Sequence, residues 1–332
     1  MRIAVDAMGG DYAPKAVVAG VIEARKGLSG VDQIILVGDE SAIKKEFQSH
    51  AVIPAGIDIF HASETVGMGE SPAIAIRRKK DSSIGRAVDL VKEGRVDAMV
   101  SAGNTGAVVV AATLKLRTLS GIERPAIAAV MPAMGKPFVL IDAGGNTDCT
   151  PHMLVQFAVM GSIYSREILG QANPVVGLMS VGTEESKGNE ITKEAFQLMG
   201  ESGLNFKGNI EGHDLFEGNI DVAVCDGFVG NVILKTSESV AHVVTSWIKM
   251  EVKRNPIRIL GALMMKGVFR SLKKKLDPAL HGGAPLLGVN GICIISHGAS
   301  NAEAIYHAIR VARDSALHGV NARITQAIGG AV

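Results

Sequence analysis

The chain has 332 residues, of which 47% are hydrophobic and 20% are charged, and its formal net charge is +1. This composition excludes a disordered chain, and the length is sufficient for two packed lobes. No apolar run approaches the roughly 20 residues that a membrane-spanning helix needs. The first residues lead into a short apolar strand, not a secretory signal, so we expect a cytoplasmic protein. Cys149, Cys225 and Cys293 are widely spaced, and we expect reduced thiols that pack in the interior.

Apolar runs alternate with helical patterns along the whole chain. The runs predicted to be buried strands lie at residues 2–5, 33–38, 98–103, 126–131, 137–144, 175–182, 221–227 and 291–298. The predicted helices lie at residues 14–25, 82–94, 106–119, 153–169 and 301–317. Continuous apolar strands interleaved with helices predict an α/β protein, in which a mostly parallel sheet is covered by helices on both faces.

Glycine-rich loops with small polar residues follow nearly every predicted strand. Their sequences are MGGD, SAGNTG, DAGGNTD, SVGTEESKGN, CDGFVGN and SHGASN. Ligands of parallel α/β sheets bind at the carboxyl ends of the strands, where helix N-termini favour anions. Ordinary turn and helix-cap chemistry is the alternative for any one loop. Six such loops, expected at one edge of the sheet, favour an anion site.

Motif spacing restricts which anion this is. The opening AMGGDY lacks the G-x-G-x-x-G spacing of a dinucleotide site, and the run from Gly177 to Thr183 lacks the lysine of a Walker loop. The H-E-x-x-H and G-x-S-x-G motifs are absent too. Ser300 precedes Glu303 by three residues, which predicts a helix capping box and not a nucleophile. We therefore expect no nucleotide cofactor and no metal.

Eight longer strings occur in a characteristic order over essentially the whole chain. They are MRIAVDAMGGDYAP, VSAGNTGA, ERPAIA, VLIDAGGN, SVGTEESKGN, CDGFVGNV, GGAPLLGVNG and SHGAS. Because it contains these strings in this order, the chain resembles the PlsX family of bacterial phosphate acyltransferases. The resemblance implies a homodimer with a fold similar to the isocitrate and isopropylmalate dehydrogenases and to phosphotransacetylase. It also implies transfer of a long-chain acyl group from an acyl carrier protein thioester to inorganic phosphate. The acyl phosphate would serve phospholipid synthesis, with a membrane glycerol-3-phosphate acyltransferase as functional partner.

The implied reaction makes modest demands on acid–base chemistry. Phosphate is substantially dianionic near neutral pH, and a free thiol has a pKa of about 8.5. Positioning the anion and stabilising an oxyanion are then the main tasks, and neither needs a covalent nucleophile. Two other functions stay open at this stage: an NAD(P)-linked decarboxylating dehydrogenase of the same fold, and a non-enzymatic scaffold at the membrane. The lack of clustered acidic residues counts against the dehydrogenase.

Candidate catalytic residues come from the strand-end loops. Lys187 is the only Lys or Arg in these loops, although pairing with its neighbouring glutamates would leave it a solvated surface lysine. Asn104 is a candidate donor, and helix capping is its alternative role. His297 is a candidate acid for the departing sulfur. The candidate phosphate- or substrate-binding residues are Gly103, Thr105, Gly106, Asp142, Asn146, Glu184, Asn189, Asp226 and Asn231.

A basic segment interrupts the α/β pattern. Residues 249–275 contain nine basic residues and one acidic residue, a local net charge of +8. Asn255–Pro256 predicts a break between two helices, and the second is amphipathic. Such a helix favours an anionic membrane surface or an acidic partner such as the carrier protein, and packing within a dimer is the alternative. The candidate contact residues are Arg258, Leu260, Met264, Lys266, Arg270, Lys273 and Lys274.

The domain prediction follows from this interruption. We expect a catalytic core over 1–235 and 285–332 and a helical arm over 236–284. The arm would hold the protein at the membrane periphery. Nucleic acid is not an expected partner, because the basic run contains only one aromatic residue for stacking, Phe269.

Overall fold

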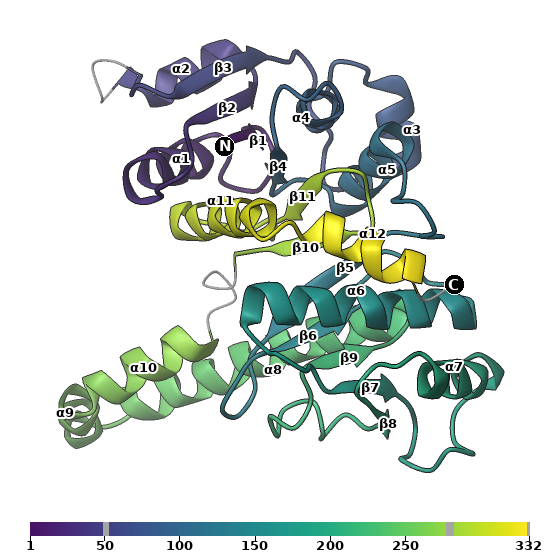
Figure 1. Cartoon of the computed structure of the whole chain (residues 1–332). Helices are drawn as coiled ribbons and strands as arrows, with labels where there is room; N and C mark the ends of the chain where they lie inside the picture. Colours follow the sequence, from purple (N-terminus) through teal and green to yellow (C-terminus); the bar gives the residue numbers. More distant parts are fainter. Residues whose placement is uncertain (49–52, 277–281, 331–332) are drawn as a thin grey trace.

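The computed structural model describes residues 1–48, 53–276 and 282–330. Within these residues 11 strands form one sheet in the order β3-β2-β1-β4-β11-β10-β5-β6-β9-β7-β8 (Figure 1). The strands are β1 Arg2–Asp6, β2 Gln33–Gly38, β3 Ile57–His61, β4 Ala98–Ser101, β5 Ala126–Met131, β6 Phe138–Ile141, β7 Val176–Met179, β8 Phe206–Ile210, β9 Val222–Val224, β10 Ala284–Leu287 and β11 Ile292–Ile295. All eight predicted strands are present, and the α/β class is confirmed.

Helices connect most of the strands. They are α1 Lys15–Gly27, α2 Glu40–Glu46, α3 Pro72–Arg78, α4 Ser83–Lys92, α5 Thr105–Leu116, α6 Pro151–Leu169, α7 Glu190–Glu201, α8 Gly227–Lys253, α9 Pro256–Met264, α10 Lys266–Leu276, α11 Ala302–Leu317 and α12 Val320–Gly330. The five predicted helices correspond to α1, α4, α5, α6 and α11.

The sheet changes direction in its middle. Strands β3, β2, β1, β4 and β11 run parallel, and so do β6, β9, β7 and β8. Between these two groups, three successive antiparallel pairings join β11 to β10, β10 to β5, and β5 to β6. An odd number of reversals makes the two groups run in opposite senses. The six loops therefore follow two oppositely directed groups of strands and form two clusters, not one row along a single edge of the sheet.

Both faces of the first strand group are buried. Ile3 and Val5 of β1 pack with α1 and α11, whereas Ala4 between them packs with α4 and α5. Successive side chains of a strand point to opposite faces, so a strand covered on both sides is apolar throughout. In the second group, α6 and α12 cover one face (Figure 1).

The three cysteines are buried free thiols, as the sequence predicts. Burial raises the pKa of Cys149 and of Cys293 to about 12, and it raises that of Cys225 well above the ordinary thiol value. A thiol with so high a pKa is neutral near pH 7 and is a poor nucleophile.

The basic segment forms an arm that projects from the body (Figure 1). The predicted break at Asn255–Pro256 is confirmed, and the Asn255 side chain caps α9 by accepting a hydrogen bond from the Ile257 amide. A second break at Met265 divides the predicted amphipathic helix into α9 and α10. Helix α8 runs without interruption from the sheet into the arm. Among the described residues, every helix is too short or too polar to cross a membrane.

Close packing at the start of α8 gives a prediction about stability. A Cβ at Gly230 would overlap the carbonyl oxygen of Asp142, so Gly230→Ala forces the loop and helix apart. Overpacking of this kind costs about 1–3 kcal/mol, and we expect a lower thermal midpoint. Gly200 in α7 is the matched control, because nothing lies within 4 Å of its Cβ position. Gly200→Ala is expected to raise the midpoint slightly, since alanine favours helix over glycine. Equal midpoints for the two variants would contradict the packing described here.

Candidate functional site

The first loop cluster consists of the loops that follow β1, β4 and β11 together with the first two residues of α5, that is residues 7–14, 102–106 and 296–301. The Asp11 amide donates to the Gly298 carbonyl at 2.8 Å. The Ser296 amide donates to the Ser101 carbonyl at the same distance. Loops from three neighbouring strands are thereby held together.

A buried aspartate organises this cluster. Asp6 ends β1, and its carboxylate accepts hydrogen bonds from the Ser101 hydroxyl at 2.7 Å and from the Met8 amide at 3.1 Å. Burial raises the pKa of Asp6, and these hydrogen bonds oppose the increase. A Cβ at Gly9 would lie 2.6 Å from the Gly103 nitrogen. This glycine therefore permits close loop packing, which is a structural role.

Both ends of the Asn104 side chain are engaged. Its oxygen caps α5 by accepting from the Ala107 amide at 3.0 Å. Its nitrogen lies 3.1–3.2 Å from the carbonyl oxygens of Gly67, Met68 and Glu70. No N–H group is left over for phosphate, so Asn104 acts here as a positioning residue. Its neighbour Thr105 is exposed, and its hydroxyl has no protein partner among the described residues.

The turn after β11 contains His297 and Ser300. The Nδ1 atom of His297 accepts from the Ala299 amide at 3.1 Å, so the neutral ring carries its hydrogen on the exposed Nε2 side. The predicted capping box at Ser300 is wrong. Asn301 caps α11 instead, accepting from the Ala304 amide, while the Ser300 hydroxyl bonds within the turn to Ser296. The helix starts one residue later because the Ser300 side chain is already engaged.

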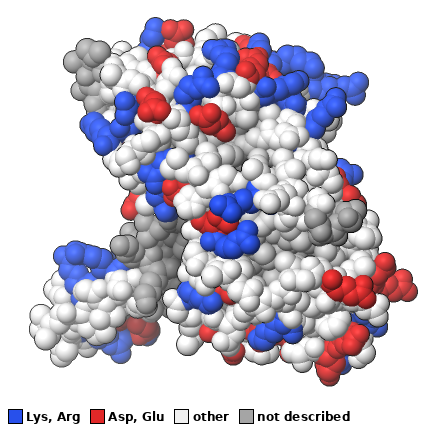
Figure 2. Space-filling model, in the orientation of Figure 1, with Lys and Arg blue, Asp and Glu red and all other residues white. Residues whose placement is uncertain are grey.

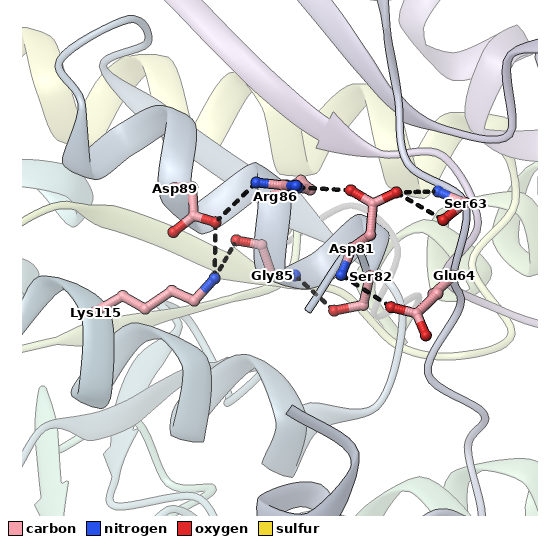
Figure 3. A network of polar contacts seen from close by, with 8 residues as sticks. All are labelled: Ser63, Glu64, Asp81, Ser82, Gly85, Arg86, Asp89 and Lys115. Carbon is pink, nitrogen blue, oxygen red and sulfur yellow. Dashed lines mark hydrogen bonds and ion pairs between the residues drawn. The ribbon is translucent and has the colours of Figure 1, made fainter. Parts of the chain in front are cut away.

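A polar network ties the segment after β3 to α4 and α5 (Figure 3). The Asp81 carboxylate accepts from the amide and hydroxyl of Ser63 and from Arg86 at 2.7–2.8 Å. These bonds lower the pKa of Asp81, those from Ser63 most strongly. Lys115 of α5 reaches Asp89 of α4 at 2.8 Å. The network joins Ser63 and Glu64, at the start of segment 62–71, to helices α4 and α5.

The second loop cluster consists of the loops that follow β6, β7 and β9 together with the start of α8, that is residues 142–150, 180–189 and 225–231. Asp142 is buried, and its carboxylate accepts from the backbone amides of Ile127, Gly144, Gly145 and Asn146 at 2.6–3.2 Å. Burial raises the pKa of Asp142 against these bonds. The Asn146 side chain donates to Asp142 and to the Pro125 carbonyl. Asp142 and Asn146 therefore stabilise the conformation of loop 142–150 by internal hydrogen bonds.

Two predicted binding residues of this cluster cap helices. Asp226 accepts from the Val229 amide and caps α8, and Asn189 accepts from the Thr192 amide and caps α7. Capping is compatible with anion binding, because the remaining N–H groups of the first turn stay available. Asn231, in the first turns of α8, is exposed and forms no side-chain hydrogen bond within the described part of the chain.

Lys187 is exposed and differs from a paired surface lysine. Neither Glu184 nor the other flanking glutamates form an ion pair with its ammonium group in the described structure. Its aliphatic stem packs at 2.9 Å from the Cβ position of Gly182. The loop itself is anchored by Asn209 of β8, which donates to the Glu184 carbonyl at 2.9 Å. The charge of Lys187 is thus left available to an anion.

The structure brings the predicted residues together in two sets. Gly103, Asn104, Thr105, Gly106 and His297 belong to the first loop cluster. The second loop cluster contains Asp142, Asn146, Glu184, Lys187, Asn189, Asp226 and Asn231. Among residues 1–48, 53–276 and 282–330, no hydrogen bond or ion pair joins the two sets.

The arm residues are exposed. Leu260 and Met264 of α9 are 62% and 84% accessible to solvent. Arg258 pairs with Glu251 at 2.7 Å, whereas Lys266 and Arg270 form no ion pair in the described part. Lys273 and Lys274 lie on α10, but their side chains are outside the described residues.

Sequence reasoning missed segment 62–71, which Asn104 holds against the first loop cluster. The signal was present in Ser71–Pro72, because proline is favoured in the first turn of a helix and α3 begins there. The contact between this segment and Asn104 joins positions more than 30 residues apart, and local patterns do not predict such pairs.

The role of Asn104 can be tested without an activity assay. Asn104→Asp keeps the cap on α5 but loses the N–H donors to the carbonyls of Gly67, Met68 and Glu70. We expect faster amide hydrogen exchange in residues 64–71 and unchanged exchange in α5. Thr105→Ala is the control, since the Thr105 side chain holds no part of this segment. Unchanged exchange in Asn104→Asp would show that the segment is fixed by other contacts.

Comparisons with known proteins give a family match over nearly the whole chain. The family model described as "Fatty acid synthesis protein" matches residues 1–323. Phosphate acyltransferase of Trichlorobacter lovleyi is 48% identical over 98% of this chain and 94% of its own length. The protein of the same name from Pelotomaculum thermopropionicum is 51% identical over 95% of this chain and 91% of its own.

A solved structure shows the same fold. A phosphotransacetylase from Streptococcus pyogenes superposes with a TM-score of 0.65 at 18% identity, covering 96% of this chain and 94% of that one. The match in fold extends over nearly the full length of both proteins. By the extent of these matches, the chain belongs to the fatty acid synthesis protein family whose curated members are named phosphate acyltransferases.

Proposed function

We propose that this protein transfers a long-chain acyl group from the thioester of acyl carrier protein to inorganic phosphate. The family assignment supports acyl transfer to phosphate as the reaction class. The observation that carries the proposal in this chain is the unpaired ammonium group of Lys187, which follows a buried strand beside the N-terminus of α7. A fixed cation next to free helix amides is suited to hold a phosphate dianion.

The reaction needs placement more than proton transfer. The phosphate oxygen attacks the thioester carbonyl, an oxyanion forms, and the carbon–sulfur bond breaks to release the carrier thiolate. In this proposal Lys187 and Asn231 hold the phosphate. Thr105 and the Nε2–H group of His297 are the available donors of the first loop cluster for the oxyanion or the departing sulfur. Fixed donors of this kind commonly contribute more to the rate of acyl transfer than any other single effect.

Two alternatives have weaker support. Family membership favours acyl transfer over an NAD(P)-linked decarboxylating dehydrogenase of the same fold. A purely structural scaffold at the membrane would bind vesicles without turnover. Phosphate-dependent release of free thiol from an acyl carrier protein thioester separates all three functions in one assay, and release without phosphate would indicate a thioesterase.

The arm supports a second part of the proposal, peripheral membrane association. Ile257, Leu260 and Met264 form an exposed apolar row on α9, and Val268 and Leu272 are exposed on α10. Exposed apolar side chains beside basic ones suit an anionic bilayer surface, and each nearby basic residue adds roughly 1 kcal/mol there. Acyl phosphate is lipid-like, and an enzyme held at the membrane surface would release it at the shortest distance from a membrane acyltransferase.

Homodimer formation is the remaining part of the proposal. Helix α8 buries only Gly227 and Gly230, while Val240, Val244 and Trp247 are exposed along its outer length. An apolar helix face of this length is suited to pack against its symmetry mate in a two-fold interface.

Replacement of Lys187 tests the catalytic part. Lys187→Ala removes the free cation, and we expect phosphate-dependent thiol release to fall on the order of 10²–10³-fold, with unchanged circular dichroism. Lys193→Ala is the matched control, because Lys193 is also an exposed lysine without an ion pair, one turn into α7. Wild-type kinetics in Lys187→Ala would remove Lys187 from the site.

Replacement of Leu260 tests the membrane part. Leu260→Glu places a charge on the exposed apolar row, and we expect loss of sedimentation with anionic liposomes while soluble acyl transfer and the sedimentation coefficient stay unchanged. Leu317→Glu is the control, since Leu317 is equally exposed at the end of α11. Conversion to a monomer by Leu260→Glu would assign the arm to the subunit interface instead.

A further inference from the structure

A second basic feature lies far from the arm in the sequence. Four consecutive basic residues, 77–80, lie at the end of α3, and Figure 2 shows basic side chains gathered where Figure 1 places α3. Lys79 is half-buried and pairs with Glu70 at 2.6 Å. Arg77, Arg78 and Lys80 are exposed and form no ion pair among the described residues. These three residues, the α3 basic cluster, are unused by the proposed chemistry.

The α3 basic cluster is rigidly connected to the first loop cluster. Pro72 of α3 lies 2.5 Å from the Cβ position of Gly106, so α3 packs directly on the first turn of α5. Asn104 holds the segment that precedes α3 through three carbonyl groups. The nearby acid Asp81 does not neutralise the cluster, because it is engaged by Ser63 and Arg86.

Exposed apolar side chains lie between the cluster and the turn after β11. Ile74 of α3 is 54% accessible, and Met68 of the preceding segment is 52% accessible. The Met68 methyl group lies 3.0 Å from the Cβ position of Gly298, next to His297. An apolar acyl chain or thioester arm arriving from α3 would therefore pass over Ile74 and Met68.

We propose that the α3 basic cluster docks an acidic carrier protein and that its thioester arm passes over Met68 to the first loop cluster. This inference rests on the proposed acyl transfer, because that reaction makes an acidic carrier protein the donor. Two unpaired cations at the end of a fixed helix and a third just after it attract an acidic surface over the Debye length and orient it on contact. An anionic bilayer is a poorer fit, since Ile74 is the one large apolar side chain that α3 exposes, within the described residues.

The test reverses charge at the cluster and compares two substrates. Arg77→Glu combined with Arg78→Glu is expected to lower kcat/KM for acyl carrier protein thioester at least about tenfold at low salt. The loss in kcat/KM for the carrier protein thioester should become smaller as ionic strength rises. For a small acyl-pantetheine thioester, which lacks the carrier protein, kcat/KM should stay within about twofold of wild type. The matched control is Lys26→Glu combined with Lys45→Glu, an equal charge change at exposed lysines of α1 and α2 that lack ion pairs.

Three outcomes would overturn the inference. Equal losses on both substrates would make the cluster part of the reaction site or of the fold, and no loss on either would exclude docking there. Loss of anionic liposome binding with unchanged turnover would assign the cluster to lipid. Direct binding of the unacylated carrier protein, measured by calorimetry on wild type and variant, separates this inference from the proposed reaction. Carrier binding that depends on Arg77 and Arg78, without any thiol release, would support docking and contradict the reaction.

Discussion

Two buried carboxylates determine the shape of both loop clusters. Asp6 is the last residue of β1 and Asp142 directly follows β6, and each carboxylate accepts hydrogen bonds from amides of the loop after its strand and from a group of a neighbouring strand. Burying a carboxylate without such donors would cost much free energy, so the loops are held where their N–H groups satisfy it. Packing requires the glycines at 9 and 230, because a Cβ at Gly9 would meet the Asp6 carboxylate and one at Gly230 would meet the Asp142 backbone carbonyl. The donors that remain free for a ligand are those that neither carboxylate uses.

The sequence predicted eight strands and helices α1, α4, α5, α6 and α11, because continuous apolar runs and a 3.6-residue period are local properties. It did not predict β3, β8 and β10; the first two, IDIFH and FKGNI, contain polar or charged residues and are the two edge strands of the sheet. The sequence did not predict the order of the strands, because the antiparallel placement of β10 between β11 and β5 depends on pairings between distant segments. That placement separates the six glycine-rich loops into two sets, whereas a purely parallel sheet would have put them at one edge.

In the candidate site, too, local sequence patterns do not show which single side chains are free to bind a ligand. Asn104 and Asn231 look equivalent in the sequence, since each lies in a glycine-rich strand-end loop. In the structure the amide of Asn104 is saturated by three carbonyl groups, and that of Asn231 is free among the described residues. Likewise, Lys187 has glutamates on both sides in the sequence, yet its ammonium group makes no ion pair with them in the described part of the chain. Hydrogen-bond partners distant in the sequence decide which polar residues can bind a ligand.

The two basic regions differ in what accompanies their charge, and this separates their roles. The arm combines basic residues with an exposed apolar row, the combination that inserts into a lipid surface. In the α3 basic cluster, two cations on α3 and one just after it form no ion pair among the described residues, and Ile74 is the one large apolar side chain that α3 exposes there; this suits a soluble acidic protein. Exposed charges are screened within about 8 Å at physiological ionic strength. In Figure 1 the arm and α3 lie on opposite sides of the molecule, so within one chain the two sets of charges act on different regions. In the docking that we propose, the α3 basic cluster supplies the charge that positions a carrier protein beside the first loop cluster.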